Sequence, residues 1–129
     1  MQTKGNLAIV DELFAPSFVD RTPMLGVSPD REGVKRLFAM FRVAFPDMRA
    51  VIHDQVAEDD RVATRKSFYA THLGELMGIP PTGKSVRIDV FDVLRLENGQ
   101  VVEHWGVVDQ LGLMQQLGVI PAPADPVTA

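Results

Sequence analysis

Residues 101–118 read VVEHWGVVDQLGLMQQLG and carry the clearest structural pattern in the chain. The valine-rich first part follows an Asn98-Gly99 pair, which is typical of a two-residue hairpin turn, so the pattern predicts two antiparallel strands on either side of that turn. After Asp109, apolar residues recur at helical spacing until Gly118, which predicts a short helix. Asp109 is therefore expected at a strand-to-helix junction.

The turn also predicts which side chains of this hairpin share a face. A two-residue turn places Leu96 opposite Val101. The same register places Asp92 opposite Trp105 and brings Asp109 onto their face, among apolar side chains. The reverse face then carries a mixed set of side chains: Arg87, Asp89, Phe91, Arg95 and His104.

Two carboxylates on an apolar wall favour either chemistry or a structural role. Burial and a like-charged neighbour both disfavour the ionised form, so we expect at least one of Asp92 and Asp109 to have a raised pKa, which suits a general base. In the structural alternative, Asp109 caps the following helix and Asp92 accepts a buried hydrogen bond. The sequence leaves both readings open.

Composition narrows the class of protein. The 129 residues, 46% of them hydrophobic, predict one domain over 1–120 followed by a Pro/Ala-rich tail over 121–129. A formal charge of −4 without a Lys/Arg run argues against nucleic acid or a membrane surface as partner, and the absence of cysteine excludes disulfides and thiolate sites. No apolar run reaches the roughly 20 residues of a membrane span and no signal peptide is visible, so we expect a cytoplasmic protein.

Along the chain, the pattern predicts helices first and strands afterwards. One helix is expected from about Leu7 to Pro16, and a second from Ser28-Pro29 to Pro46 with a broad apolar stripe. Extended stretches then predict four strands, at 48–57, 61–72, 85–96 and 101–108. This order indicates an α+β fold, with N-terminal helices packed on a curved antiparallel four-stranded sheet, a C-terminal helix, and a pocket between the layers.

Several segments resemble the SnoaL-like polyketide cyclases of the NTF2-like fold, and the resemblance runs from about Leu7 to Gly118. They are His72-Leu73-Gly74, Gly78-Ile79-Pro80-Pro81-Thr82-Gly83-Lys84, Asp92, Arg95, Asn98-Gly99, Glu103-His104-Trp105, Asp109 and Gln116-Leu117-Gly118.

The resemblance implies a cone-shaped barrel with a deep cavity and a lyase-type reaction without a cofactor. A base would remove a proton from an activated methylene of a polyketide-type ester, and the carbanion would attack a carbonyl of the same molecule to close a ring. The family places an acid/base aspartate near the end of the last strand, which corresponds to Asp109, and its ligand is a small apolar or aromatic polyketide.

Four further side chains are candidates for substrate contact. Trp105 is expected to line the pocket wall beside Asp92. His72 either donates to a substrate carbonyl or ties the following loop together, and Phe68 shares its strand face. His104 is expected on the opposite face unless a bulge intervenes, in an interface or a structural hydrogen bond.

Two expectations concern partners. The three histidines fall on three different strands without ligand spacing, so no metal site is expected. The reverse face, with Arg87, Phe91, Arg95 and His104, suits a self-complementary contact and predicts a homodimer.

The alternatives to a cyclase are a hydrolase or isomerase that uses Asp92 and Asp109 as a pair, and a non-catalytic protein that binds a small molecule.

Overall fold

The computed structural model describes residues 7–121, in which one mixed sheet carries all the strands. In chain order its elements are α1 (Ile9–Leu13), β1 (Phe14–Asp20), α2 (Arg31–Ala44), β2 (Arg49–Glu58), β3 (Arg61–Thr71), β4 (Ser85–Glu97), β5 (Gln100–Val108) and α3 (Gln110–Leu117). The sheet order is β1-β5-β4-β3-β2, with β1 parallel to β5 and every other pair antiparallel. The α+β architecture is confirmed.

The four predicted strands and the last helix lie where local sequence signals placed them. Asn98 and Gly99 both have positive φ angles, 52° and 77°, and Glu97 pairs with Gln100, so the predicted two-residue turn is present. Helix α3 ends at Leu117, and Gly118 caps it with a φ of 81°, the left-handed conformation that glycine adopts without strain.

The prediction of four strands is wrong, because the chain adds β1 at one edge of the sheet. The N-terminal helix ends at Leu13 rather than near Pro16, and the chain continues extended along β5. Phe14 and Phe18 have helical spacing, yet their rings meet edge to face with centroids 4.9 Å apart in this irregular strand. Pro16 lies within β1. A proline is tolerated in this strand because β1 is at the sheet edge, where one side of the backbone has no partner strand.

Helix α2 begins two residues later than predicted. Asp30 rather than Ser28 is the N-cap, since its carboxylate accepts a hydrogen bond of 2.9 Å from the Gly33 amide. Ser28 supports the cap by donating to the Asp30 carboxylate at 2.7 Å. The helix ends at Ala44, two residues before Pro46.

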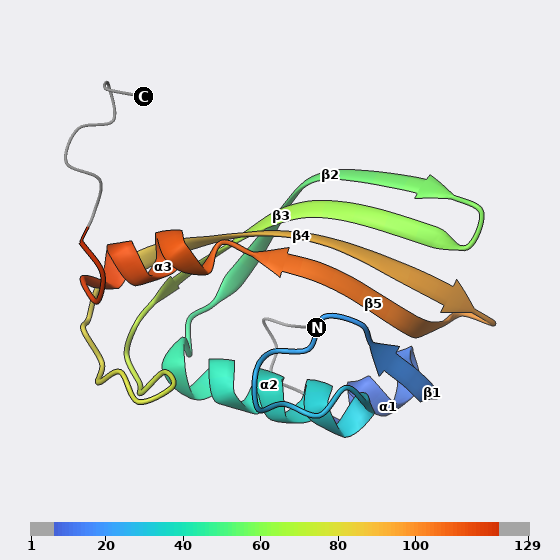
Figure 1. The fold of residues 1–129 in the computed structure, drawn as a ribbon, viewed down its shortest axis with the longest axis horizontal. Coiled ribbons are helices and arrows are strands. Elements are labelled where there is room, and N and C mark those ends of the chain that lie inside the picture. The colour runs from blue at the N-terminus through green and yellow to red at the C-terminus, as the bar shows by residue number, and fades with distance from the viewer. Residues whose placement is uncertain (1–6, 122–129) are drawn as a thin grey trace.

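The sheet is strongly curved, and the helices lie on its concave side (Figure 1). We call this side the inner face and the opposite side the outer face. The core fills the inner face at one end, where α3, the C-terminal turn of α2 and the β3–β4 loop meet. Its buried members are Ala44, Phe45, Phe68, Ala70, Leu76, Val86, Ile88, Val90, Leu113 and Leu117.

In the described part of the chain, no helix is both long and apolar enough to cross a membrane. The predicted Pro/Ala-rich tail lies outside the described residues from position 122 onward.

The loop after β3 is docked on the end of α2, and Gly74 makes this possible. Its amide donates to the Ala44 carbonyl at 3.2 Å, and a Cβ at this position would lie 2.0 Å from the Val43 carbonyl oxygen.

Gly74→Ala is therefore expected to destabilise the fold by about 1–3 kcal/mol, because two backbone segments must separate. Urea unfolding measures this, with Glu75→Ala at the exposed neighbour as control, and equal midpoints for the two variants would contradict the close contact.

Candidate functional site

An extra residue in β5 sets the faces of the β4–β5 hairpin. Leu96 pairs with Val101 as predicted, but the next pair is Arg95 with Glu103, so Val102 forms a β-bulge. Because side chains alternate, one extra residue moves every later side chain of β5 to the other face. The predicted register beyond Val102 is therefore wrong.

The bulge exchanges the positions of two candidate residues. His104 pairs with Leu94 and lies on the inner face with Asp92, although the sequence analysis placed it on the reverse face. Trp105 pairs with Val93 and points to the outer face, so it does not share a wall with Asp92 as predicted.

Asp109 does not join Asp92 on an apolar wall, and that predicted placement is also wrong. Strand β5 ends at Val108, and the Asp109 side chain is exposed. Its carboxylate accepts a hydrogen bond of 2.9 Å from the Gly112 amide and caps α3. The structural alternative for Asp109 is thus the one observed.

Four polar side chains from four neighbouring strands meet on the inner face, and we call them the inner-face polar row. They are Asp20 on β1, His104 on β5, Asp92 on β4 and Lys66 on β3. The Asp20 carboxylate lies 3.0 Å from His104 Nδ1, and the Asp92 carboxylate lies 3.9 Å from His104 Nε2. Lys66 Nζ lies 2.9 Å from the same Asp92 oxygen.

The row is largely shielded from water. Asp92 is 8% exposed, and the Lys66 side chain is 13% exposed. Burying an ion is costly unless an opposite charge or hydrogen bonds compensate it, and each carboxylate of the row has such a partner. The sheet thus holds charged groups in place where apolar residues would otherwise pack.

The imidazole of His104 has a defined orientation. A carboxylate only accepts hydrogen bonds, so contact with Asp20 places the proton of neutral His104 on Nδ1 and leaves Nε2 as an acceptor. Gly106 makes room for the ring, because a Cβ there would lie 2.8 Å from His104 Nε2. The arrangement suits a general base whose orientation is set by a second residue.

Asp20 was not among the predicted site residues, because its segment has no strand pattern in the sequence. The Asp20 carboxylate also accepts a hydrogen bond of 3.0 Å from the Thr22 amide. Burial raises the pKa of the Asp20 carboxyl, but the hydrogen bonds from His104 and Thr22 outweigh it and hold the pKa below its ordinary value. Asp20 is therefore an anion suited to stabilise a protonated imidazole.

Phe68 lies on the inner face of β3 and His72 directly follows that strand, and neither belongs to the inner-face polar row. His72 is fully buried, and its Nδ1 accepts a hydrogen bond of 3.2 Å from the Thr82 amide, which closes the β3–β4 loop. Its Nε2 has no hydrogen-bond partner among the described residues. Phe68 belongs to the core, with Lys66 Nζ 5.4 Å from the centre of its ring.

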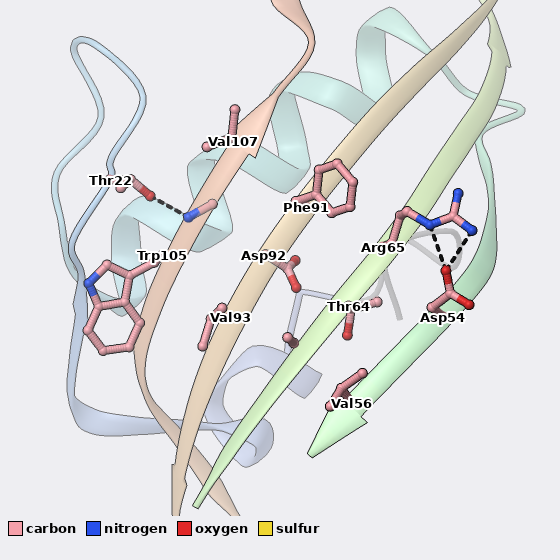
Figure 2. A pocket seen from close by; sticks show the side chains of 12 residues that line it. Thr22, Asp54, Val56, Thr64, Arg65, Phe91, Asp92, Val93, Trp105 and Val107 are labelled. Atoms are coloured by element: carbon pink, nitrogen blue, oxygen red, sulfur yellow. Dashed lines mark hydrogen bonds and ion pairs between the residues drawn. The ribbon is translucent and has the colours of Figure 1, made fainter. Parts of the chain in front are cut away.

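The outer face carries a shallow groove of about 480 Å³ (Figure 2). Phe91, Val93, Trp105 and Val107 line it, and the Asp54–Arg65 ion pair, 2.6 Å long, borders it. Phe91 is 59% exposed and Val107 is 70% exposed, so this face presents apolar side chains to its surroundings. The groove and the polar row thus lie on opposite faces of the same strands.

Comparison with protein families matches residues 1–117 to the SnoaL-like polyketide cyclases. A search of curated proteins found no match.

Solved structures share the fold over nearly the whole chain. IdmH from Streptomyces antibioticus, a proposed polyketide cyclase, has 35% sequence identity and a TM-score of 0.79, with 91% of this chain and 90% of that chain covered. AclR from Streptomyces galilaeus, a proposed hydroxylase, has 34% identity and a TM-score of 0.82, with 95% and 76% covered. TsrD from Streptomyces laurentii has 26% identity and a TM-score of 0.83, with 92% and 87% covered.

The lowered pKa of Asp20 predicts a pH-dependent contribution to stability. An ionised carboxylate with a depressed folded-state pKa stabilises the fold above about pH 4, and this contribution is lost as the pH falls through the folded-state value. Asp20→Asn is therefore expected to lower the urea midpoint at about pH 7, and the difference from wild type should be smaller at about pH 3, below the ordinary pKa of the carboxyl. Asp59→Asn, in the exposed β2–β3 turn, controls for the loss of one charge. A difference that stays constant between the two pH values would contradict the prediction.

Proposed function

Since this chain belongs to the SnoaL-like polyketide cyclase family, we propose that it closes a ring in a polyketide-type ester by a cofactor-independent intramolecular aldol reaction, with His104 as the base. The observation that supports this assignment is the Asp20–His104–Asp92 arrangement on the inner face.

The proposed reaction begins with proton transfer. His104 Nε2 removes a proton from a methylene that two carbonyl groups activate, and the imidazole becomes an imidazolium. The Asp20 carboxylate at Nδ1 and the Asp92 carboxylate near Nε2 both stabilise that positive charge. A positioned base of this kind contributes about 10²- to 10⁴-fold in rate.

Ring closure follows within the same substrate molecule. The carbanion attacks a second carbonyl carbon, one carbon–carbon bond forms, and the carbonyl oxygen becomes an alkoxide. The imidazolium returns its proton to that alkoxide, so the product is an isomer of the substrate. Holding the folded conformer in place lowers the barrier because the reacting carbons start close together.

This proposal moves the base from Asp109, the residue that the resemblance implied, to His104. Asp109 is exposed and already serves as the N-cap of α3, whereas His104 and Asp92 meet on the shielded inner face. Substrate contact by His72, Phe68 and Trp105 stays a prediction.

Two substitutions separate the candidate bases. His104→Gln keeps a polar side chain but removes the base, so the turnover rate should fall by about 10²- to 10⁴-fold. Asp109→Asn should leave turnover nearly unchanged, because asparagine caps a helix as well as aspartate does. Turnover can be measured with synthetic β-keto esters that carry a second carbonyl within ring-closing distance. Deuterium exchange at the activated methylene, followed by NMR, reports on the base independently of ring closure.

The products of this assay distinguish the remaining functions. An isomer, or an isomer that has lost water, indicates cyclisation, whereas added water indicates a hydrolase and an added oxygen atom would match the activity proposed for AclR. Loss of turnover in Asp109→Asn with normal turnover in His104→Gln would contradict our assignment. Binding without exchange or turnover would favour a non-catalytic protein.

We also propose that the outer face forms a homodimer contact. Phe91 and Val107 line the groove and expose apolar surface, and alternation along β4 places Arg87 and Arg95 on the same face as Phe91. His104, which the sequence analysis included in this surface, points to the inner face instead. Contiguous apolar surface of this kind typically marks an interaction site.

Light scattering tests this contact. The wild-type chain of 14.2 kDa is expected to show about twice that mass at micromolar concentration. Phe91→Glu should give a folded monomer, because a carboxylate would be buried in the contact. Leu25→Glu, at a fully exposed loop position away from the sheet, is the matched control and should stay dimeric. A monomeric wild type would contradict the proposal.

A further inference from the structure

Lys66 is a cation in an unusual position. Its side chain lies on the inner face between Phe68 and Asp92, with Nζ 5.4 Å from the ring centre and 2.9 Å from the carboxylate. Lysine is among the residues least often buried, and shielding an ammonium ion from water is costly. The pairing with Asp92 compensates part of this cost, but an apolar residue at both positions would avoid it altogether.

The charges of the row indicate what this cation can do. Asp20 and Asp92 are carboxylates and Lys66 is an ammonium, so the row carries one net negative charge while His104 is neutral. A substrate that loses a proton to His104 becomes an enolate, which the two carboxylates repel. Within the row, Lys66 is the group that attracts an anion at every stage of the reaction.

On the inner face, Lys66 has an exposed apolar neighbour on the adjacent strand. Ile52 pairs with Lys66 across β2 and β3, so the two side chains share this face, and Ile52 is 57% exposed. Ile52 therefore offers an exposed apolar contact beside the shielded ammonium, while the ring of Phe68 next to Lys66 is buried in the core.

We propose that Lys66 binds the oxyanion that forms on the substrate when His104 takes its proton, and that the site therefore prefers ligands whose enolic or phenolic oxygen is ionised over their neutral forms. This inference rests on the proposed function, because it assigns the electrophilic partner of His104. Asp92 then has two effects: it lies 3.9 Å from His104 Nε2, where the proton is received, and it competes with the substrate oxyanion for Lys66. If Lys66 only neutralised Asp92, the site would show no preference for an anion.

A coloured phenol can test this without the natural substrate. We would use 4-nitrophenol, whose phenolate absorbs visible light and which titrates near neutral pH, and measure its affinity and its pKa when bound. Lys66, Asp92, His104 and Asp20 are the titratable groups that face the proposed site from the four strands. The wild-type protein is expected to bind the phenolate more tightly than the phenol and to lower the pKa of the bound probe.

The variants have opposite expected effects. Lys66→Met should weaken phenolate binding about 10- to 100-fold, which corresponds to the loss of a hydrogen bond to a charged group, and should abolish the pKa shift of the probe. Lys66→Arg should retain both. Asp92→Asn removes the competing carboxylate and should strengthen phenolate binding about 10-fold. Lys35→Met, on α2 beside Asp11, removes a lysine outside the row and controls for net charge.

The phenolate-binding results do not depend on whether His104 is the base. His104→Gln should retain the preference for the phenolate, so loss of turnover in that variant and loss of phenolate binding in Lys66→Met report on separate proposals. If Lys66→Met does not fold, Asp92→Asn alone distinguishes the two roles of Lys66. A lysine that binds the oxyanion predicts tighter phenolate binding in Asp92→Asn, whereas a lysine that only neutralises Asp92 predicts unchanged or weaker binding. Equal affinity of the wild type for phenol and phenolate would overturn the inference.

Discussion

The bulge at Val102 is the constraint on which the candidate site depends. It places His104 and Asp92 on the same face of the sheet, at 3.9 Å, and turns Trp105 to the other face. Without the extra residue, alternation would return His104 to the outer face and leave Asp92 beside an indole. A single inserted residue therefore separates a polar inner face from an apolar outer face on the same strands.

The polar row is stabilised by contacts between strands. Asp20 reaches His104 because β1 runs parallel to β5 at the sheet edge, and Lys66 reaches Asp92 from the neighbouring strand β3. Each charged group is thus held by a rigid backbone ladder, which limits reorganisation when charge moves during a reaction. The same geometry explains why Gly106 is needed opposite Asp92, since any larger residue would compete with the imidazole for space.

The two faces have different roles in our proposals. The inner face combines a base, two carboxylates and an ammonium ion with apolar neighbours, a combination that suits substrates with ionisable oxygen atoms. The outer face exposes Phe91 and Val107 around a shallow groove, which suits contact with a second copy of the chain. Because both faces belong to β4 and β5, a dimer contact would support the strands that hold His104 and Asp92.

Local sequence signals determined much of this fold. The Asn98-Gly99 turn, the strand boundaries and the capping of α3 by Asp109 each depend on residues close together in the chain, so dihedral preferences and hydrophobic periodicity were enough to predict them. The tertiary structure decided β1, the bulge at Val102 and the polar row. Asp20 and His104 are 84 residues apart, and Phe14–Asp20 became a strand because β5 offered a free edge. Which side chains meet across strands depends on register, and one additional residue reverses it without any local signal in the sequence.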